Sequence, residues 1–414
     1  MSSASDSSAP IEIDLTDPAI KKDPWPTLRR LREEDPIHYL DFMDGWLVTR
    51  YDDVKALHVD PRVTGDQRVW QHYKPPAEGT FQHWIDNYGL MAVSGKDHAR
   101  QRHLLAHGFT PRGVARMDAQ IREVVKHYAE PLKGRSGVID IMKEFTTPIP
   151  AAVISTITGV AADGVAQERF SRLSQEVVQG FFGFVSDEVI ERSERSYIEL
   201  ASWVRETVRK RRENPEEDLI SDLVEARHGE HKFSDEDIVA QVSALVAAGS
   251  ETTATGGVLS IMTLLDHPEA LEEVRRDRSL IPQTVHEILR LAFGGIFGTR
   301  RFAVDDFELK GRKIRKGQML VLSLGGASHD PARYPDPERF DVHRNPQDLL
   351  TFGSGAHYCL GANLAKGELY CMVDAALDFL PPGARVLKEQ IEVQSLGMFD
   401  RTMTCPVDFG GGAS

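Results

Sequence analysis

The chain has 414 residues, which is enough to bury a large core, and by length alone it predicts about two or three domains. Its net charge of −14 argues against general nucleic-acid binding. Three cysteines allow at most one disulfide, which fits a reducing, cytoplasmic setting. The N-terminus is polar without a signal-peptide core, and no run reaches the roughly 18 apolar residues of a membrane span. We therefore expect a disordered tail over residues 1–15 and no membrane association.

The polar and apolar pattern predicts a mainly helical chain with small β-sheets. Residues 24–60 read as short helices around a β-hairpin, and residues 65–90 read as a long irregular loop. Residues 112–230 look mostly helical, whereas 307–309 and 318–324 look like strands. No internal repeat interrupts this order.

A helix is predicted near residues 97–108, and it places His98 and Arg102 on one face because they are four positions apart. Taken alone, the two side chains could be an ordinary solvated pair on a surface helix.

A second predicted helix is long and nearly uncharged. Ser234 followed by acidic residues marks its start, and residues 238–250 are apolar all round, so the helix should cross the core. Its middle contains three residues that are unfavourable inside a buried helix. Gly249 lowers helix stability, Glu251 places an acid in the core, and the Thr252 hydroxyl can hydrogen-bond to the preceding turn. Such conflicts at one point indicate function.

Glu287 and Arg290 are three apart on a further predicted helix and can pair, although helical Glu/Arg pairs are common.

The most informative stretch is Thr351-Phe-Gly-Ser-Gly-Ala-His-Tyr-Cys359-Leu-Gly361. Its glycines allow tight turns, and Cys359 precedes a predicted helix whose N-terminus favours a thiolate. Two other readings are an ordinary buried cysteine and a zinc site. The zinc site lacks a CxxC pair, because Cys371 and Cys405 lie far along the chain.

The spacing Phe352-x-x-Gly355-x-His357-x-Cys359-x-Gly361 resembles the haem-binding loop of the cytochromes P-450, the haem-thiolate monooxygenases. The other motifs follow in that family's order along nearly the whole chain. The resemblance implies one domain over residues 16–414, with haem b between the long central helix and the cysteine loop. It therefore replaces the division into several domains predicted from length.

The resemblance assigns roles to individual residues. Cys359 is the metal ligand, and the haem propionates are held by His98, Arg102, His357 and Arg301, with Arg300 as the alternative to Arg301. Glu251 and Thr252 are the acid–alcohol pair that delivers protons during oxygen activation. Glu287, Arg290 and Arg339 form a structural lock behind the cysteine loop.

The resemblance also implies a mostly apolar substrate pocket. We expect its lining from Phe181, Phe184, Leu245, Ala248, Phe293, Ile296, Phe297 and Met398. A glycine stands in the segment 293–298 where the family usually has a proline, so the backbone there should be looser. The expected substrate is a hydrophobic small molecule that is hydroxylated or epoxidised.

Electrons have to come from a separate protein, because no flavin or iron–sulfur domain is fused to the chain. We expect a ferredoxin-type donor fed by a reductase, and a monomeric enzyme. The donor should dock on basic residues near the cysteine, with Arg102, Arg112, Arg344 and Lys366 as candidates. Three alternatives remain: a peroxide-using haem-thiolate enzyme, an isomerase that does not need oxygen, and a haem-binding sensor without turnover.

Overall fold

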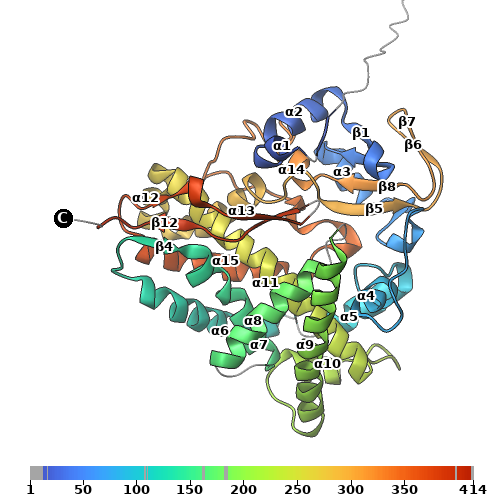
Figure 1. The fold of residues 1–414 in the computed structure, drawn as a ribbon, viewed down its shortest axis with the longest axis horizontal. Helices are drawn as coiled ribbons and strands as arrows, with labels where there is room; N and C mark the ends of the chain where they lie inside the picture. The colour runs from blue at the N-terminus through green and yellow to red at the C-terminus, as the bar shows by residue number, and fades with distance from the viewer. Residues whose placement is uncertain are drawn as a thin grey trace, which may run out of the picture.

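The computed structural model describes residues 13–15, 17–106, 109, 111–160, 164–180, 185–396 and 399–411. The tail up to residue 12 and three predicted pocket residues, Phe181, Phe184 and Met398, lie outside these ranges. Helices dominate the structure, as predicted, and Figure 1 shows the largest sheet beside α1, α2, α3 and α14, with α6 to α10 gathered on the other side of the molecule.

The helices are α1 Pro18–Lys22, α2 Trp25–Glu34, α3 Tyr51–Leu57, α4 Phe81–Tyr88, α5 Gly95–Ala106, α6 Pro111–Ala129, α7 Pro148–Thr158, α8 Gly164–Gln179, α9 Asp187–Glu213, α10 Leu219–Glu225, α11 Asp235–Asp266, α12 Pro268–Arg276, α13 Ile281–Leu291, α14 Leu324–Ser328 and α15 Ala362–Phe379. The strands are β1 Ile37–Leu40, β2 Gly45–Val48, β3 Val63–Thr64, β4 Val138–Asp140, β5 Thr299–Ala303, β6 Phe307–Leu309, β7 Arg312–Ile314, β8 Met319–Leu322, β9 Arg385–Val386, β10 Val393–Leu396, β11 Phe399–Thr402 and β12 Pro406–Asp408.

The largest sheet has the order β1-β2-β8-β5-β3. β1 and β2 form the predicted antiparallel hairpin, β2 pairs with β8 in parallel, and β5 runs antiparallel to β8. Leu28 and Leu31 of α2 are buried against Leu47 and Val321 of this sheet, which closes a core cluster separate from the helical one. One smaller sheet contains β4, β12 and β9. A second pairs β10 with β11, and a third pairs β6 with β7.

Helix α11 runs through the centre of the molecule (Figure 1) and packs against α7, α8, α9 and α15. The predicted cap is present: the Ser234 hydroxyl accepts from the Asp237 N–H, and the Asp237 carboxylate accepts from the Ser234 N–H. Most of its residues are buried, and its buried Val, Ile and Leu side chains belong to the main core cluster, as expected for an apolar helix. None of the helices in the ranges above combines the length and apolar composition needed to cross a bilayer.

The prediction of an irregular loop over 65–90 was wrong for part of that segment, because α4 lies inside it. The Thr80 hydroxyl accepts from the His83 N–H at 3.2 Å and caps this helix. The carboxylate of Glu194 accepts from the Phe81 N–H at 2.9 Å, so a residue on α9 satisfies the exposed helix end. A partner more than one hundred residues away leaves no local pattern.

Candidate active site

The cysteine loop lies directly ahead of α15 and is shaped by its own backbone. The Cys359 N–H donates to the Phe352 carbonyl at 2.9 Å, which closes the loop into a hairpin-like turn. Gly353 and Gly355 have φ values of 72° and 69°, in the left-handed region that favours glycine. Thr351 Oγ1 donates to the Leu289 carbonyl at 3.1 Å and so attaches the loop to α13.

These turns present the Cys359 side chain as an exposed thiol. Neighbouring protein atoms still remove part of the water around the sulfur, which raises its pKa, whereas the Gly361 N–H, Arg102 and Lys366 lower the pKa. The loop therefore supplies a backbone donor to the sulfur at Gly361. Binding to a metal deprotonates a thiol outright, so the donor and the two cations favour the form that acts as a ligand.

Helix α11 has one accessible stripe in its buried middle. Ala248 and Thr252 are exposed and Leu245 is half-buried, whereas Val246 and Ala247 between them are fully buried. Positions 245, 248 and 252 share one face of a helix. A Cβ added to Gly249 on the same side would meet nothing within 4 Å. The helix therefore borders a hollow along this stripe.

Thr252 and Glu251 sit differently on this helix. Thr252 lies on the stripe, and its Oγ1 donates to the Ala248 carbonyl at 2.7 Å, as the sequence pattern predicts for a threonine inside a helix. The hydroxyl oxygen keeps its lone pairs to accept a hydrogen bond from a group in the hollow. Glu251 is buried, with 6% of its surface exposed.

A cluster of cationic and imidazole side chains borders the cysteine loop. The His98 ring on α5 lies 4.2 Å from the His357 ring, centroid to centroid. Burial, together with the nearby His98, Arg301 and Arg102, lowers the pKa of His357 to about 4. Burial also lowers the pKa of Arg301 to about 10 and, with help from Arg102, lowers the pKa of His98.

Two buried nitrogen atoms of this cluster indicate the kind of ligand that the cluster binds. Within the part of the chain that the structure describes, His98 Nε2 and Arg301 Nη2 are buried and have no hydrogen-bond partner. An unpaired buried donor costs about 1–3 kcal/mol, so two of them beside two more basic groups indicate a missing anionic partner. Carboxylates such as the haem propionates fit this donor set, and the exposed thiol and the hollow along α11 fit the iron and the ring.

The two neighbouring arginines of β5 differ in their surroundings. Arg301 affects the pKa of His357 and so lies within its electrostatic reach. For Arg300, burial lowers the pKa, and Asp86 is the one charged group that acts on it, in the opposite direction. Alternation along a strand explains the difference, because successive side chains point to opposite faces.

The predicted pocket residues fall into separate groups. Leu245 and Ala248 lie on the stripe of α11, and Phe293 packs against the main core cluster. Ile296 and Phe297 are buried in the cluster formed by α2 and the largest sheet. Gly294 and Gly295 have φ values of 121° and 47°, which a proline cannot adopt, so the departure from the family pattern has a geometric reason.

The structural lock has a different third member from the one predicted. Arg290 donates to Glu287 through Nε at 2.7 Å and Nη2 at 2.8 Å, and both side chains are fully buried. Arg344 Nε supplies the third contact, at 2.9 Å from Glu287 Oε1. Arg339 points to Asp341 at the surface, so its assignment to the lock was wrong.

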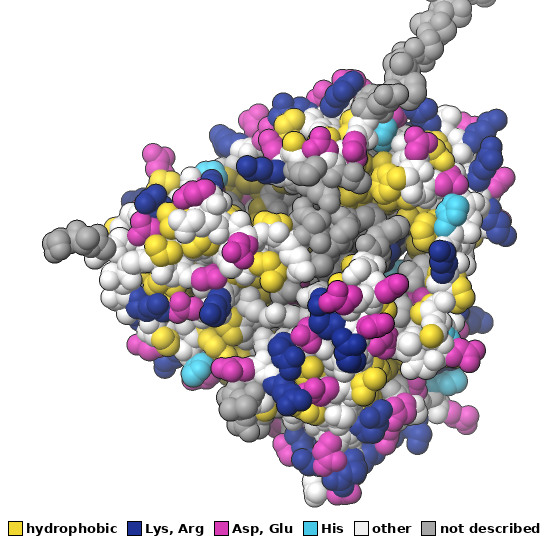
Figure 2. All heavy atoms as spheres, in the orientation of Figure 1, with side chains coloured by type: hydrophobic (Ala, Val, Ile, Leu, Met, Phe, Trp, Pro, Cys, Tyr) yellow, Lys and Arg dark blue, Asp and Glu magenta, His cyan; other side chains and the backbone are white. Residues whose placement is uncertain are grey.

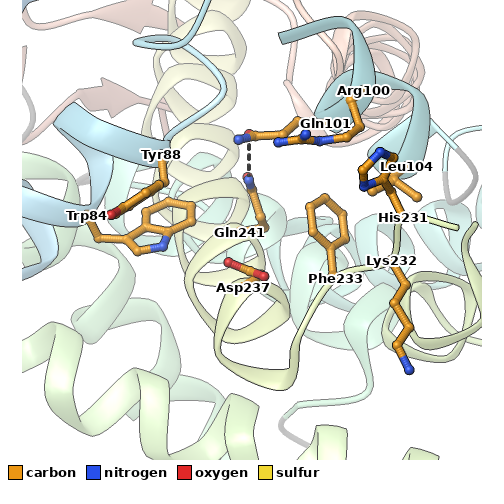
Figure 3. Close-up of a pocket in the computed structure, with 10 residues that line it drawn as sticks. All are labelled: Trp84, Tyr88, Arg100, Gln101, Leu104, His231, Lys232, Phe233, Asp237 and Gln241. Atoms are coloured by element: carbon orange, nitrogen blue, oxygen red, sulfur yellow. Dashed lines mark hydrogen bonds between the residues drawn. The ribbon is translucent and has the colours of Figure 1, made fainter. Parts of the chain in front are cut away.

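A separate surface pocket of about 280 Å³ lies on another face of α5 (Figure 3). Trp84 and Tyr88 of α4, Phe233 and the start of α11 border it, and Gln241 Nε2 donates to Gln101 Oε1 at 3.0 Å. No residue of the cysteine loop lines this pocket, so it is distinct from the hollow along the α11 stripe.

The sequence did not identify Arg344 as a member of the lock, having named it only as a docking candidate, and it did not single out His58, whose buried ring lies near the cysteine loop. Neither belongs to a local motif. Arg344 follows Arg339 by five positions, and only the fold decides which of them turns inward.

Comparison with known proteins places these features in a family. Residues 46–378 match the family model described as Cytochrome P450. A polyketide biosynthesis cytochrome P450, PksS, from Bacillus subtilis is 30% identical over 86% of this chain and 88% of its own length. The epothilone C/D epoxidase of Sorangium cellulosum is 32% identical over 85% and 84%. The 6-deoxyerythronolide B hydroxylase of Saccharopolyspora erythraea is 32% identical over 86% and 88%.

Solved structures agree with the sequence comparisons. Epothilone D-bound cytochrome P450epoK has a TM-score of 0.87 and 29% identity, covering 97% of this chain and 100% of that one. The PksS structure has a TM-score of 0.85 and 27% identity, covering 96% and 100%.

Proposed function

Because this chain belongs to the cytochrome P450 family, we propose that the hollow along α11 would hold haem b with Cys359 as the ligand of its iron, and that the substrate is a polyketide-type natural product. The chain is a haem-binding monooxygenase, as its hydroxylase and epoxidase relatives are. The observation that carries the placement is the exposed Cys359 thiol beside two buried, unpartnered nitrogens, His98 Nε2 and Arg301 Nη2.

The haem supplies the oxygen-activating chemistry, and a thiolate ligand favours cleavage of the O–O bond. The protein residues position and protect this chemistry. His98 and Arg301 donate to the propionates, His357 and Arg102 add positive charge beside them, and the Gly361 N–H stabilises the Cys359 sulfur.

Proton delivery is assigned to Glu251 and Thr252. The Thr252 hydroxyl faces the hollow and accepts a hydrogen bond there while it donates to the Ala248 carbonyl. Glu251, buried one position earlier, passes protons toward that hydroxyl. Leu245 and Ala248 flank the same stripe and exclude bulk water from it.

The substrate class rests on the lining and on the relatives. Leu245 and Ala248 make the described part of the stripe apolar. Relatives are named for polyketide biosynthesis and for oxidation of epothilone, 6-deoxyerythronolide B and mycinamicin IV. We therefore expect a large, mostly apolar polyketide to displace water near the iron. A panel of macrolactones, fatty acids and steroids should shift the spin state of the purified protein only for the macrolactones.

A ferredoxin-type protein is proposed as the electron donor, docking on the cysteine side. Lys366 on α15 lies over the Phe352 ring, 5.7 Å from the ammonium nitrogen to the centroid, and so places a cation at the cysteine loop. Arg344 is not a docking residue, because it is paired with Glu287 in the lock and only 14% of its side chain is exposed. Arg112 lies in the first turn of α6, with its side chain outside the described part. We expect the working unit to be one chain, since all proposed haem contacts come from a single chain.

The placement of the haem is tested by spectroscopy. The reduced, carbon monoxide-treated protein should show the red-shifted absorption of thiolate-bound haem, and Cys359→Ser should lose it. Cys371→Ser, which changes a buried cysteine of α15, should keep it. An unchanged spectrum in Cys359→Ser would contradict the proposal.

A further inference from the structure

His58 ends helix α3, and the helix fixes the orientation of its imidazole ring. Its Nδ1 lies 2.8 Å from the Val54 carbonyl oxygen, which accepts, so Nδ1 carries a hydrogen and donates it. The opposite nitrogen, Nε2, therefore points away from α3. His58 is 6% exposed, and Nε2 is buried with no hydrogen-bond partner in the described ranges of the chain.

The surroundings of His58 belong to the cysteine loop and to the basic cluster. A Cβ added to Gly353 would lie 3.8 Å from His58 Nε2, so the loop backbone passes close to this atom. Burial and, to a smaller extent, the nearby charge of Arg301 lower the pKa of His58 to about 4, although the hydrogen bond to Val54 acts in the opposite direction. His58 in turn contributes to the lowered pKa of His357. His58, Arg301 and His357 thus lie within electrostatic reach of one another.

Three buried nitrogens without partners are found in this region: His58 Nε2, His98 Nε2 and Arg301 Nη2. Each such atom is unfavourable unless a partner arrives. A carboxylate accepts about four hydrogen bonds, and haem b brings two carboxylates. Two carboxylates therefore offer more than enough acceptor sites for these three nitrogens, provided that each nitrogen carries a hydrogen.

We propose that His58 is an additional haem-anchoring residue, whose Nε2–H donates to a haem propionate beside His98, His357 and Arg301. This inference rests on the haem placement proposed above. Because Nδ1 already donates to Val54, the donating form is the doubly protonated imidazolium. The carbonyl end of α3 and the propionate favour that form, while burial and Arg301 oppose it. Charge-assisted hydrogen bonds of this kind are among the stronger ones in proteins.

The chain offers a matched control. His329 is likewise buried, its Nδ1 lies 3.0 Å from the Gly325 carbonyl, and burial lowers its pKa to about 4. Its ring stacks on Trp25 at 4.0 Å, and it is not among the residues with an unpaired nitrogen. A change at His329 therefore tests the loss of a buried imidazole without the loss of a propionate contact.

The experiment measures transfer of haem from the holoenzyme to excess apomyoglobin. His58→Leu should release haem about ten-fold faster than the wild type, as expected for a lost hydrogen bond to a charged group. His58→Gln keeps a neutral donor and should give an intermediate rate, whereas His329→Leu should release haem at the wild-type rate. Equal rates for His58→Leu, His329→Leu and the wild type would overturn the inference.

Arg301→Leu separates the two proposals. If it accelerates haem release and His58→Leu does not, the role of His58 is wrong while the haem placement stands. If neither variant accelerates release, the placement fails as well. Should His58→Leu not fold, resonance Raman spectra of His58→Gln and His329→Gln replace it. A shifted propionate bending band in His58→Gln alone supports the contact, and an unshifted band rejects it.

Discussion

Arg344 Nε donates to Glu287 Oε1 at 2.9 Å and completes a buried charge network that the ExxR helix begins. Arg344 also donates through Nη1 to the Pro335 carbonyl at 2.7 Å, so it ties α13 to the segment that leads into the cysteine loop. Arg290 donates to the Pro337 carbonyl at 2.7 Å in the same segment. Glu287 therefore stands between two guanidinium groups.

Replacing Arg344 with Ala should destabilise the protein strongly, because Glu287 would lose one of its two cationic partners while remaining fully buried. We expect a loss of about 3 kcal/mol in the free energy of unfolding. Arg339→Ala is the control: its partner Asp341 lies at the surface, and exposed pairs contribute about 0–1 kcal/mol. Urea denaturation of both variants checks this, and equal losses would contradict the assignment.

The elements with strong periodicity could be predicted from the sequence. Helix α11 follows from its apolar composition and its Ser234 cap, and the conflict at Gly249 to Thr252 marks a stretch of the helix that borders a hollow. The cysteine loop follows from its glycines, two of which have positive φ. These features are local, so residue type and spacing carry them.

Long-range partners could not be predicted in the same way. Glu194 caps α4 from another helix, and Arg344 rather than Arg339 reaches Glu287. His58 belongs to no sequence motif, and its unpaired nitrogen indicates a binding site only because the fold brings it near Arg301. In each of these cases the packing of segments that are distant in the sequence determines which residues become partners, and a single sequence does not reveal that packing.

Thr252→Ala should uncouple oxygen use from product formation. The variant loses the hydroxyl that faces the hollow, while the helix keeps its backbone bonds. Oxygen consumption should continue with less product and more hydrogen peroxide, and Thr252→Ser should restore the wild-type ratio. Thr253→Ala is the adjacent control, because Thr253 is buried away from the stripe. Full coupling in Thr252→Ala would argue for the peroxide-using alternative.

Lys366→Glu should slow reduction by an acidic ferredoxin. The side chain lies over Phe352 of the cysteine loop, so a reversed charge would repel the donor where it has to approach. The effect should shrink as ionic strength rises. Lys210→Glu is the control: basic and acidic side chains are interspersed over α9 (Figure 2), and Lys210 lies among them, 3.7 Å from Glu206. Stopped-flow reduction that is equally fast in both variants would reject docking at Lys366.

Glu368 on α15 should make the protein less stable as the pH rises. Burial raises its pKa from 4.5 to about 8, and its Oε2 has no partner among the residues that the structure covers. The folded state therefore holds a proton that the unfolded state releases near its ordinary pKa. The contribution of this group is fully present below about pH 4.5 and is lost as the pH rises through about 8.

Glu368→Gln removes this dependence, because the amide stays neutral at every pH. The variant should match the wild type near pH 5 and exceed it in stability by a growing margin up to pH 8. Urea denaturation of the haem-loaded protein at several pH values measures the difference. Glu389→Gln, at an exposed glutamate, should leave the wild-type profile unchanged. A constant difference between Glu368→Gln and the wild type across this range would mean that Glu368 is ionised in the folded protein.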